Sequence, residues 1–287
     1  ISNQNYANIT SFFSSRGLPN LKRIFIERNH IDELFFNKSF FSYLKNLGIF
    51  FLIKMIYPKS DRVVAISKGL ANCLKGISSK SKVKLIYNPA FDKEILPLSR
   101  KKINFKFNKK LKYIICVSRL TKRKGIEELI ESFSDSIKID RKLRLILIGY
   151  GKNEQNINKL INYKKISKFV KIIKNCHNPY PYIKKSALFI LNSKYEGFAN
   201  VIVESVYLDT PVISTNCNSG PSEILLNGKG GKLIKVYNNR NILSKEIIKF
   251  FKDKKSLIKK NKFAKLNLDR FSIKNNVNEF NKLFIKI

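Results

Sequence analysis

The feature that most constrains the fold is an alternation of apolar runs and helical segments that begins at residue 112. Residues 113–117 and 143–148 are runs dominated by Ile, Leu and Val, and each ends at a polar or glycine-containing turn. Between them, residues 125–137 place Ile126, Leu129, Ile130 and Phe133 on one helical face. Parallel strands read as continuous apolar runs because helices cover both faces of their sheet. The pattern predicts an α/β fold with a doubly wound parallel sheet.

The same alternation continues toward the C-terminus. We expect strands at 169–173, 187–191 and 211–214, and helices at 155–163, 200–208 and 221–226. In such sheets, ligands bind at the carboxyl ends of the strands. Three segments follow predicted strand ends and should therefore lie at one edge of the sheet: Ser118-Arg119, Gly149-Tyr150-Gly151 and residues 192–200.

The first ninety residues carry a weaker version of this pattern. Strands are expected at 22–27, 63–66 and 83–87, and Ser67 is a suitable N-cap for a helix that follows the second of them. Residues 92–110 are polar and rich in lysine, which is typical of a linker between domains. A chain of 287 residues is long enough for about two domains.

The charge balance is strongly basic. The chain has 57 Lys and Arg against 20 Asp and Glu, a net charge of +37. Nucleic acid or anionic lipid would favour such a surface, and so would compositional drift in a chain crowded with Lys, Ile and Asn. The sequence contains no nucleic-acid-binding motif, so we expect no nucleic-acid partner.

Cysteine and histidine are few and scattered. The four cysteines form no Cys-x-x-Cys pair, and there are only two histidines, His30 and His177, so no zinc site is expected. Cys116 lies in an apolar run, which predicts a buried thiol. Without a disulfide pattern or a signal peptide, the chain is expected to be cytoplasmic.

An aromatic-rich segment covers residues 34–57. Its longest uncharged stretch, 46–53, is too short to span a bilayer, and Gly48 and the lysines predict two short helices. Two interpretations stay open: the segment lies in a membrane interface, or its helices pack on their own domain.

Two segments carry the residues suited to chemistry. Arg119 to Gly125 is a basic turn that follows a strand and opens a helix, and a helix N-terminus favours an anion. Glu196 to Glu204 places one carboxylate in a loop and another one turn into a helix, for which Asn200 is the expected N-cap. Carboxylates accept hydroxyl hydrogen bonds, whereas the cations would stabilise a phosphate. No Asp-x-Asp motif is present to bind a metal.

At this point the chain resembles the family 4 retaining glycosyltransferases of the glycosyltransferase-B fold. The matching segments occur in the family's order: Val64-Ala-Ile-Ser-Lys-Gly69, Ile86-Tyr-Asn-Pro89, Val117-Ser-Arg-Leu with Lys124-Gly125, Ile148-Gly-Tyr-Gly151, Asn178-Pro179 with Leu191-Asn-Ser-Lys-Tyr-Glu-Gly-Phe198, Pro211-Val-Ile-Ser-Thr-Asn-Cys217, and Ser219-Gly-Pro-Ser-Glu-Ile-Leu225. The resemblance implies two Rossmann-like domains that face a cleft, the first of them incomplete at its N-terminal end. The implied division is a partial acceptor-side domain at 1–91, a linker at 92–110, a donor domain at 111–269, and a C-terminal helix at 270–287 that packs back toward the first domain.

The resemblance also implies residue roles. Arg119 and Lys124 would bind the donor diphosphate, Glu196 the hydroxyls of the transferred sugar, and Glu204 the ribose. The remaining donor-side positions are Phe198, Ala199, Asn200, Val201, His177, Asn178 and Gly151, the last of which serves chiefly the turn. Arg28 and His30 would face the acceptor. Neither a metal nor another cofactor is expected.

The activity implied is transfer of a hexose or N-acetylhexosamine from a nucleotide diphosphate sugar, with UDP expected as the nucleotide. The form of Ser219 to Leu225 resembles members that build bacterial surface polysaccharides and lipid-linked oligosaccharides. The acceptor would then be a growing glycan or a polyprenyl-diphosphate-linked saccharide, reached by peripheral contact with the anionic inner face of the cytoplasmic membrane. Two alternatives stay open: a sugar-nucleotide epimerase of the same fold, and a non-catalytic basic module that binds membrane or nucleic acid.

Overall fold

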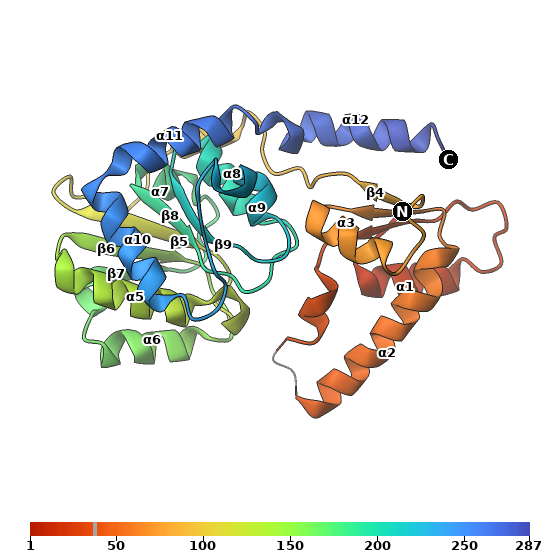
Figure 1. The fold of residues 1–287 in the computed structure, drawn as a ribbon, viewed down its shortest axis with the longest axis horizontal. Coiled ribbons are helices and arrows are strands. Elements are labelled where there is room, and N and C mark those ends of the chain that lie inside the picture. Colours follow the sequence, from red (N-terminus) through yellow and green to blue (C-terminus); the bar gives the residue numbers. More distant parts are fainter. Residues whose placement is uncertain (37–38) are drawn as a thin grey trace.

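The computed structural model describes residues 1–36 and 39–287, and its strands form two parallel sheets in separate lobes (Figure 1). The N-terminal sheet has the order β1-β2-β3-β4, with strands at Ser2–Asn3, Ile24–Glu27, Arg62–Ala65 and Val83–Leu85. The C-terminal sheet has the order β10-β9-β8-β5-β6-β7. In numerical order, β5 to β10 span Lys112–Val117, Leu143–Ile148, Val170–Ile173, Leu188–Leu191, Val212–Thr215 and Lys232–Ile234. Every strand pairing is parallel, so the predicted α/β fold is confirmed.

Helices flank both sheets. In the N-terminal lobe they are α1 (Asn5–Ser14), α2 (Phe40–Ile56) and α3 (Lys68–Lys75). The C-terminal lobe is built on α5 to α11, preceded by the short α4 and followed by α12: Ile95–Ser99, Ile126–Ile139, Glu154–Tyr163, Tyr180–Lys185, Asn200–Tyr207, Pro221–Ile224, Arg240–Lys252, Lys254–Lys265 and Ile273–Phe284.

The strand β5 shows why the C-terminal sheet is covered on both faces. Its residues alternate between two clusters, with Ile114 and Cys116 in one and Tyr113 and Ile115 in the other, and all four are buried. A run that is apolar on both sides can be stable only between two layers of helices. The predicted burial of the Cys116 thiol is therefore confirmed.

Aromatic side chains join the two lobes. The ring of Tyr87, which follows β4, lies with its centroid 4.9 Å from that of Phe271 and 5.9 Å from that of Phe198. Phe198 and Phe271 are themselves 5.1 Å apart. Because Phe198 belongs to the loop that carries Glu196, the core shared by the lobes also supports that loop.

The C-terminal helix returns to the first lobe. Figure 1 shows α12 running alongside the N-terminal sheet. Leu283 is buried in a cluster with Ile24, Val64 and Ile86, and the Asn276 side-chain amide donates to the Tyr87 carbonyl at 2.7 Å. The last helix therefore fastens the two lobes together.

The aromatic-rich segment differs from its prediction. Instead of two short helices it forms one long helix, α2, and Gly48 does not interrupt it. Together with the turn that follows it, residues 40–59 are long and apolar enough to cross a membrane by length and composition, with a mean hydropathy of 1.3 and 28% of the stretch buried. The inner face of α2 nevertheless belongs to the core, since Ile53 and Ile56 are fully buried. Residues 37–38 of the segment lie outside the described residues.

Other differences lie at element boundaries. The strands β1 and β10 were not predicted, because two or three residues carry too little periodicity to be recognised, and the ten-residue helix α1 was not predicted either. The segment 92–110 is not simply a linker: it contains α4, and Phe105 and Phe107 pack on Tyr113. These aromatic contacts attach the segment to the C-terminal lobe.

The lobes touch at Gly69. A Cβ atom on Gly69 would lie 2.0 Å from the Asn218 carbonyl oxygen, which belongs to the opposite lobe. Beside it, the Glu223 carboxylate accepts hydrogen bonds from the Lys68 amide of the N-terminal lobe at 2.8 Å and from the Gly220 amide of the C-terminal lobe at 3.0 Å. A side chain at position 69 would push this contact apart.

Gly69→Ala is therefore expected to lower the free energy of unfolding by about 1–3 kcal/mol, because the added methyl group meets backbone that cannot move freely. The matched control is Gly48→Ala, where a Cβ would meet nothing within 4 Å. That change should stabilise the exposed helix by about 0.5–1 kcal/mol. Chemical denaturation of both variants measures the difference, and equal effects would mean that the lobes do not meet at Gly69.

Candidate functional site

The sheet order of the C-terminal lobe locates the site. The order runs outward from β5 through β6 and β7 on one side and from β8 through β9 and β10 on the other, so the direction reverses between β5 and β8. Ligands of doubly wound sheets bind in the crevice at such a switch point, beyond the carboxyl ends of the strands. Arg119 follows β5 and Glu196 follows β8, so both predicted residues stand at this crevice.

The basic turn is held in place by its neighbour strand. Lys122–Lys124 form a single 3-10 turn, and Gly125 then takes a left-handed φ of 60°. A Cβ on Gly125 would lie 2.2 Å from the Asn192 carbonyl oxygen, and the Asn192 side chain donates to the Gly125 carbonyl at 2.8 Å. The turn after β5 is thus fixed to the end of β8.

Lys124 and Glu196 form an ion pair across the crevice, although they are far apart in the sequence. Each side chain is only 11% exposed. Removing one partner of a pair this buried would leave an uncompensated charge. The structure thus brings together two of the three residues that the resemblance assigns to the diphosphate and the transferred sugar, and the third, Arg119, lines the same cavity.

The loop from Glu196 to Asn200 is shaped by close backbone contacts. A Cβ on Gly197 would lie 1.7 Å from the Arg28 carbonyl oxygen of the other lobe. Ala199 has a φ of 75°, a left-handed conformation that costs energy for any residue with a side chain and is found at functional sites. Ala199, and not the predicted Asn200, is the N-cap of α8. The Asn200 side chain instead accepts a hydrogen bond from Asn88 at 2.8 Å.

These segments enclose a cavity of about 340 Å3 between the lobes. It is lined by residues of both lobes, including Gln4, Arg28, Asn29, Asn88, Ser118, Arg119, Arg123, Lys124, Glu196, Phe198, Ala199, Asn200 and Val201. All of the predicted positions from Phe198 to Val201 are among them, as is Arg28.

A second cavity, of about 550 Å3, continues from the first along the strand ends and shares Arg119 with it. His177, one of the predicted donor-side positions, lines it. Asn178 and Gly151 do not line this cavity. The Asn178 amide donates to the Leu98 carbonyl at 2.8 Å, and a Cβ on Gly151 would lie 2.4 Å from the Leu120 carbonyl oxygen. Both residues therefore shape turns and do not line this cavity.

Glu204 lies in α8, one turn beyond the loop, and does not line either cavity wall directly. Burial raises the pKa of its carboxyl group to about 7. A carboxylate in so apolar a place gains from hydroxyl donors that replace lost water. The predicted contact with ribose hydroxyls would supply such donors.

The acceptor-side prediction concerned Arg28 and His30. The buried Glu27 carboxylate accepts from the Arg28 and Asn29 amides at 3.0 and 3.2 Å and from the Tyr57 hydroxyl at 2.7 Å, which fixes the turn after β2. His30 is buried beside this turn, and burial lowers its pKa. The structure thus places Arg28 in the cavity between the lobes that contains Arg119 and Glu196, and His30 in a neighbouring one.

Sequence reasoning missed several residues of the site. Arg123 forms an ion pair with Glu33 of the opposite lobe, and Asn88 reaches across to Asn200. Gln4 and Asn29 line the cavity from the N-terminal lobe. Asn88 belongs to the recognised segment 86–89 and could have been found there, whereas no local pattern distinguishes Gln4 or Glu33.

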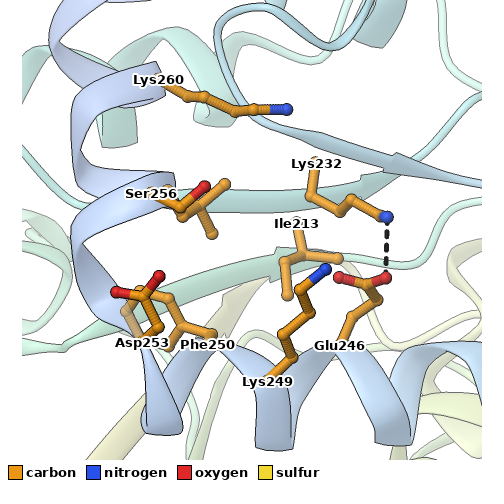
Figure 2. A pocket seen from close by; sticks show the side chains of 9 residues that line it. Ile213, Lys232, Glu246, Lys249, Phe250, Asp253, Ser256 and Lys260 are labelled. Carbon is orange, nitrogen blue, oxygen red and sulfur yellow. Dashed lines mark ion pairs between the residues drawn. The ribbon is translucent and has the colours of Figure 1, made fainter.

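Another cavity, of about 110 Å3, lies elsewhere (Figure 2). It is bounded by the helices α10 and α11 and by the starts of β9 and β10, opposite the strand ends that form the site. Figure 2 shows Lys232 directed at Glu246, an ion pair of 2.7 Å. Lys260 donates to the Gly228 carbonyl at 2.9 Å. Since these cations are engaged and the cavity is small, it is not a second candidate for the donor.

Comparison with known proteins agrees with this geometry. Residues 99–267 match the family described as glycosyl transferases group 1. The chain belongs to this family.

Individual relatives point the same way. The chain is 30% identical over 79% of its length to the N-acetylgalactosamine-N,N'-diacetylbacillosaminyl-diphospho-undecaprenol 4-alpha-N-acetylgalactosaminyltransferase of Campylobacter jejuni, and it spans 60% of that protein. It is 27% identical over 64% of its length to the capsular polysaccharide biosynthesis glycosyltransferase CapM of Staphylococcus aureus, and it spans 50% of that protein. The crystal structure of Anabaena HepE in complex with UDP has the same fold, with a TM-score of 0.81 at 16% identity over 99% of this chain and 77% of the other. The glycosyltransferase-B fold of this family member is therefore confirmed.

The pKa of Glu204 predicts how stability depends on pH. The carboxyl group's ordinary pKa is 4.5 and burial raises it to about 7. The stabilisation that protonation gives the folded state is therefore fully present below pH 4.5 and is lost as the pH rises through 7. Glu204→Gln is neutral at every pH. Without ligand, the free energy of unfolding of this variant, relative to that of the wild type, should therefore rise by about 2.5 kcal/mol between pH 5 and pH 8. Thermal unfolding across this range measures the gain, and a constant difference would contradict the assigned burial.

Proposed function

We propose that the chain carries the donor site of a retaining glycosyltransferase that moves a hexose or N-acetylhexosamine from a UDP-sugar to a glycan or lipid-linked acceptor. The observation that carries the proposal is the pairing of Lys124 with Glu196 at the switch point of the sheet, beside Arg119. One ligand satisfies both groups at once if it joins a phosphate to a sugar, since the cation takes the phosphate and the carboxylate takes the hydroxyls.

The cations supply the electrostatic part of catalysis. As the bond between the anomeric carbon and the diphosphate breaks, negative charge grows on the departing nucleotide. Arg119 and Lys124 would lie where that charge develops, and the partial burial of Lys124 would make its attraction stronger than in solution. The free amides at the start of α8 add partial positive charge on the other side.

Retention of configuration requires the acceptor to arrive on the face from which the nucleotide leaves. The acceptor oxygen then forms its bond to the anomeric carbon, and its proton passes to an oxygen of the departing diphosphate. This route needs no protein base at the anomeric carbon. Glu196 would hold the sugar hydroxyls during the exchange, and protein cations would carry the diphosphate without a metal.

The acceptor class rests on the relatives. The Campylobacter jejuni protein is named for transfer to a diphospho-undecaprenol-linked saccharide and the Staphylococcus aureus protein for capsular polysaccharide synthesis. We infer a role in the synthesis of bacterial surface polysaccharide for this chain too. Because the chain spans 60% and 50% of these two relatives, the assay below uses the full-length protein.

Lys124→Ala and Glu196→Ala are each expected to lower transfer from a UDP-sugar by about 10²–10³-fold, because each removes a group that stabilises the transition state. Lys122→Ala is the matched control: Lys122 lies in the same turn, is exposed, and does not line the cavity. Transfer is measured with a panel of UDP-, GDP- and ADP-sugars. Full activity in both variants would refute the assignment, and conversion of the free donor without an acceptor would favour the epimerase.

We further propose that α2 rests in an anionic membrane interface, which would place the enzyme at the inner face of the cytoplasmic membrane. Phe41, Leu44, Phe51 and Met55 recur at spacings of three, four and seven, and their side chains are 83%, 48%, 60% and 45% exposed. Lys45, Lys54 and Lys59 flank this stripe and residues 34–60 contain no acidic residue. An apolar stripe beside lysines is typical of a helix that lies in a membrane surface.

Phe41→Ser with Phe51→Ser is expected to reduce binding to phosphatidylglycerol-containing vesicles by about tenfold or more, because two large apolar side chains no longer enter the interface. Leu266→Ser is the control, since Leu266 is 85% exposed on the other lobe. Vesicle co-sedimentation at low and high salt measures the loss. Equal binding by the double variant and the control would exclude α2 as the contact.

A further inference from the structure

A third cavity, of about 210 Å3, opens beside the donor cavity on the N-terminal lobe. The two cavities share Gln4 and Asn29, so a molecule in one would adjoin a molecule in the other. The polar residues that line the third cavity come from the start of α1, the turn after β2 and the middle of α2: Gln4, Asn5, Asn29, His30, Glu33 and Asn46.

The lining is unusual for this chain because of its charge. Lysine and arginine account for 57 of 287 residues, yet among the described residues none of those that line this cavity is a Lys or an Arg. The groups present are side-chain amides, a carboxylate and a histidine whose pKa is lowered by burial. Amides and carboxylates form hydrogen bonds with hydroxyl and acetamido groups, whereas a phosphate would find no cation in the described part of this lining to balance its charge.

Several of these polar groups are built into the wall. The side chains of Asn5, His30 and Asn46 are each 7% exposed. Glu33 pairs through one carboxylate oxygen with Arg123 of the donor turn. Its other oxygen, Oε2, is buried and has no hydrogen-bond partner among residues 1–36 and 39–287. A buried acceptor in this condition is costly unless a ligand supplies a donor.

Gln4 adds an independent observation. Its backbone has a φ of 76° and a ψ of 154°, a conformation that is largely restricted to glycine. The strain is maintained by the hydrogen bond from the Gln4 amide to the Ile26 carbonyl, at 2.8 Å. A glutamine held in a glycine conformation, with its side chain at the junction of two cavities, indicates that the side chain is required there.

We propose that this cavity binds the terminal sugar of the acceptor, and that this sugar is an uncharged saccharide and not a phosphate. The inference rests on the proposed glycosyltransferase function, whose acceptor class it narrows. Glu33 and the amides of Gln4 and Asn46 receive the sugar's hydroxyl and acetamido groups. The enzyme then extends an existing glycan and does not start one on a lipid phosphate. Through its two oxygens, Glu33 connects the acceptor sugar to the turn that holds the donor.

The test is binding of simple probes to the full-length protein, with and without UDP. The neutral probes are the methyl α-glycosides of N-acetylgalactosamine, N-acetylglucosamine, galactose and glucose, and the phosphate probes are farnesyl phosphate and inorganic diphosphate. Saturation-transfer NMR should detect at least one methyl glycoside, which should then serve as an acceptor for the transferred sugar. Farnesyl phosphate should not serve as an acceptor.

Two variants locate the binding. Glu33→Gln and Gln4→Gly should each raise the KM for the accepted glycoside by about tenfold or more, since each removes hydrogen bonds to the sugar. In both variants the loss for the glycoside should exceed the loss of UDP affinity; some loss for UDP is expected, because Glu33 pairs with Arg123 of the donor turn and Gln4 lines both cavities. Gln4→Gly is compatible with the local backbone and should fold at least as stably as the wild type. Glu94→Gln, an exposed carboxylate outside the cavity, is the matched control.

The outcomes separate this inference from the proposed function. A protein that hydrolyses a UDP-sugar but binds no neutral glycoside, or that glycosylates farnesyl phosphate, overturns the inference alone. A protein that binds no nucleotide sugar at all overturns the proposed function, and the NMR measurement without UDP still decides whether the cavity takes a sugar. Glycoside binding that Glu33→Gln and Glu94→Gln weaken equally would also overturn the assignment.

Discussion

The contact between Gly197 and the Arg28 carbonyl is the constraint on which the rest of the site depends. A Cβ at position 197 would lie 1.7 Å from that oxygen, so the loop that carries Glu196 can approach the N-terminal lobe only through a bare backbone. Buried Glu27 holds the opposing turn in place through the Arg28 and Asn29 amides. Neither lobe therefore contains a complete site. The donor cavity and the cavity beside it exist because two fixed turns meet, and Gly69 repeats the arrangement at the Asn218 carbonyl.

Charge is balanced locally within a chain that is basic as a whole. The net charge is +37, yet Lys124 is paired with Glu196 and Arg123 with Glu33 at the centre of the molecule. Breaking a buried pair by removing one partner costs about 3–5 kcal/mol. A free phosphate that drew Lys124 away would leave Glu196 without a partner, whereas a sugar joined to a diphosphate offers hydroxyls to Glu196 at the same time. The pair would thus favour the whole donor over its phosphate part.

The C-terminal lobe was predicted well because its buried strands can be recognised from short stretches of sequence. Runs such as 143–148 are apolar on both faces and can only be buried strands, and the residues that follow them must meet at one edge of the sheet. The segments that carry Arg119, Lys124 and Glu196 were placed at that edge in this way, whereas the roles of these residues came from the family resemblance. Asn200 was misassigned as an N-cap because nothing in the local sequence shows that Ala199 takes a left-handed conformation. The two residues before it, Gly197 and Phe198, lie close to the Arg28 carbonyl of the other lobe and to Gly220, and these contacts are distant in the sequence.

The N-terminal side of the site could not be predicted for the same physical reason. Gln4 and Asn29 lie in turns between elements and Glu33 in a 3-10 turn of four residues, so none of them belongs to a segment long enough to show a period. Their importance comes from the residues that face them. The strain at Gln4 and the uncoordinated oxygen of Glu33 become visible only when the cavity they line is formed. Neither feature stabilises the fold locally: glycine would fit the backbone conformation at position 4 with less strain, and a carboxylate with both oxygens hydrogen-bonded would be more stable at position 33. Their persistence at one junction argues that the surface is shaped by what it binds as well as by the fold that carries it.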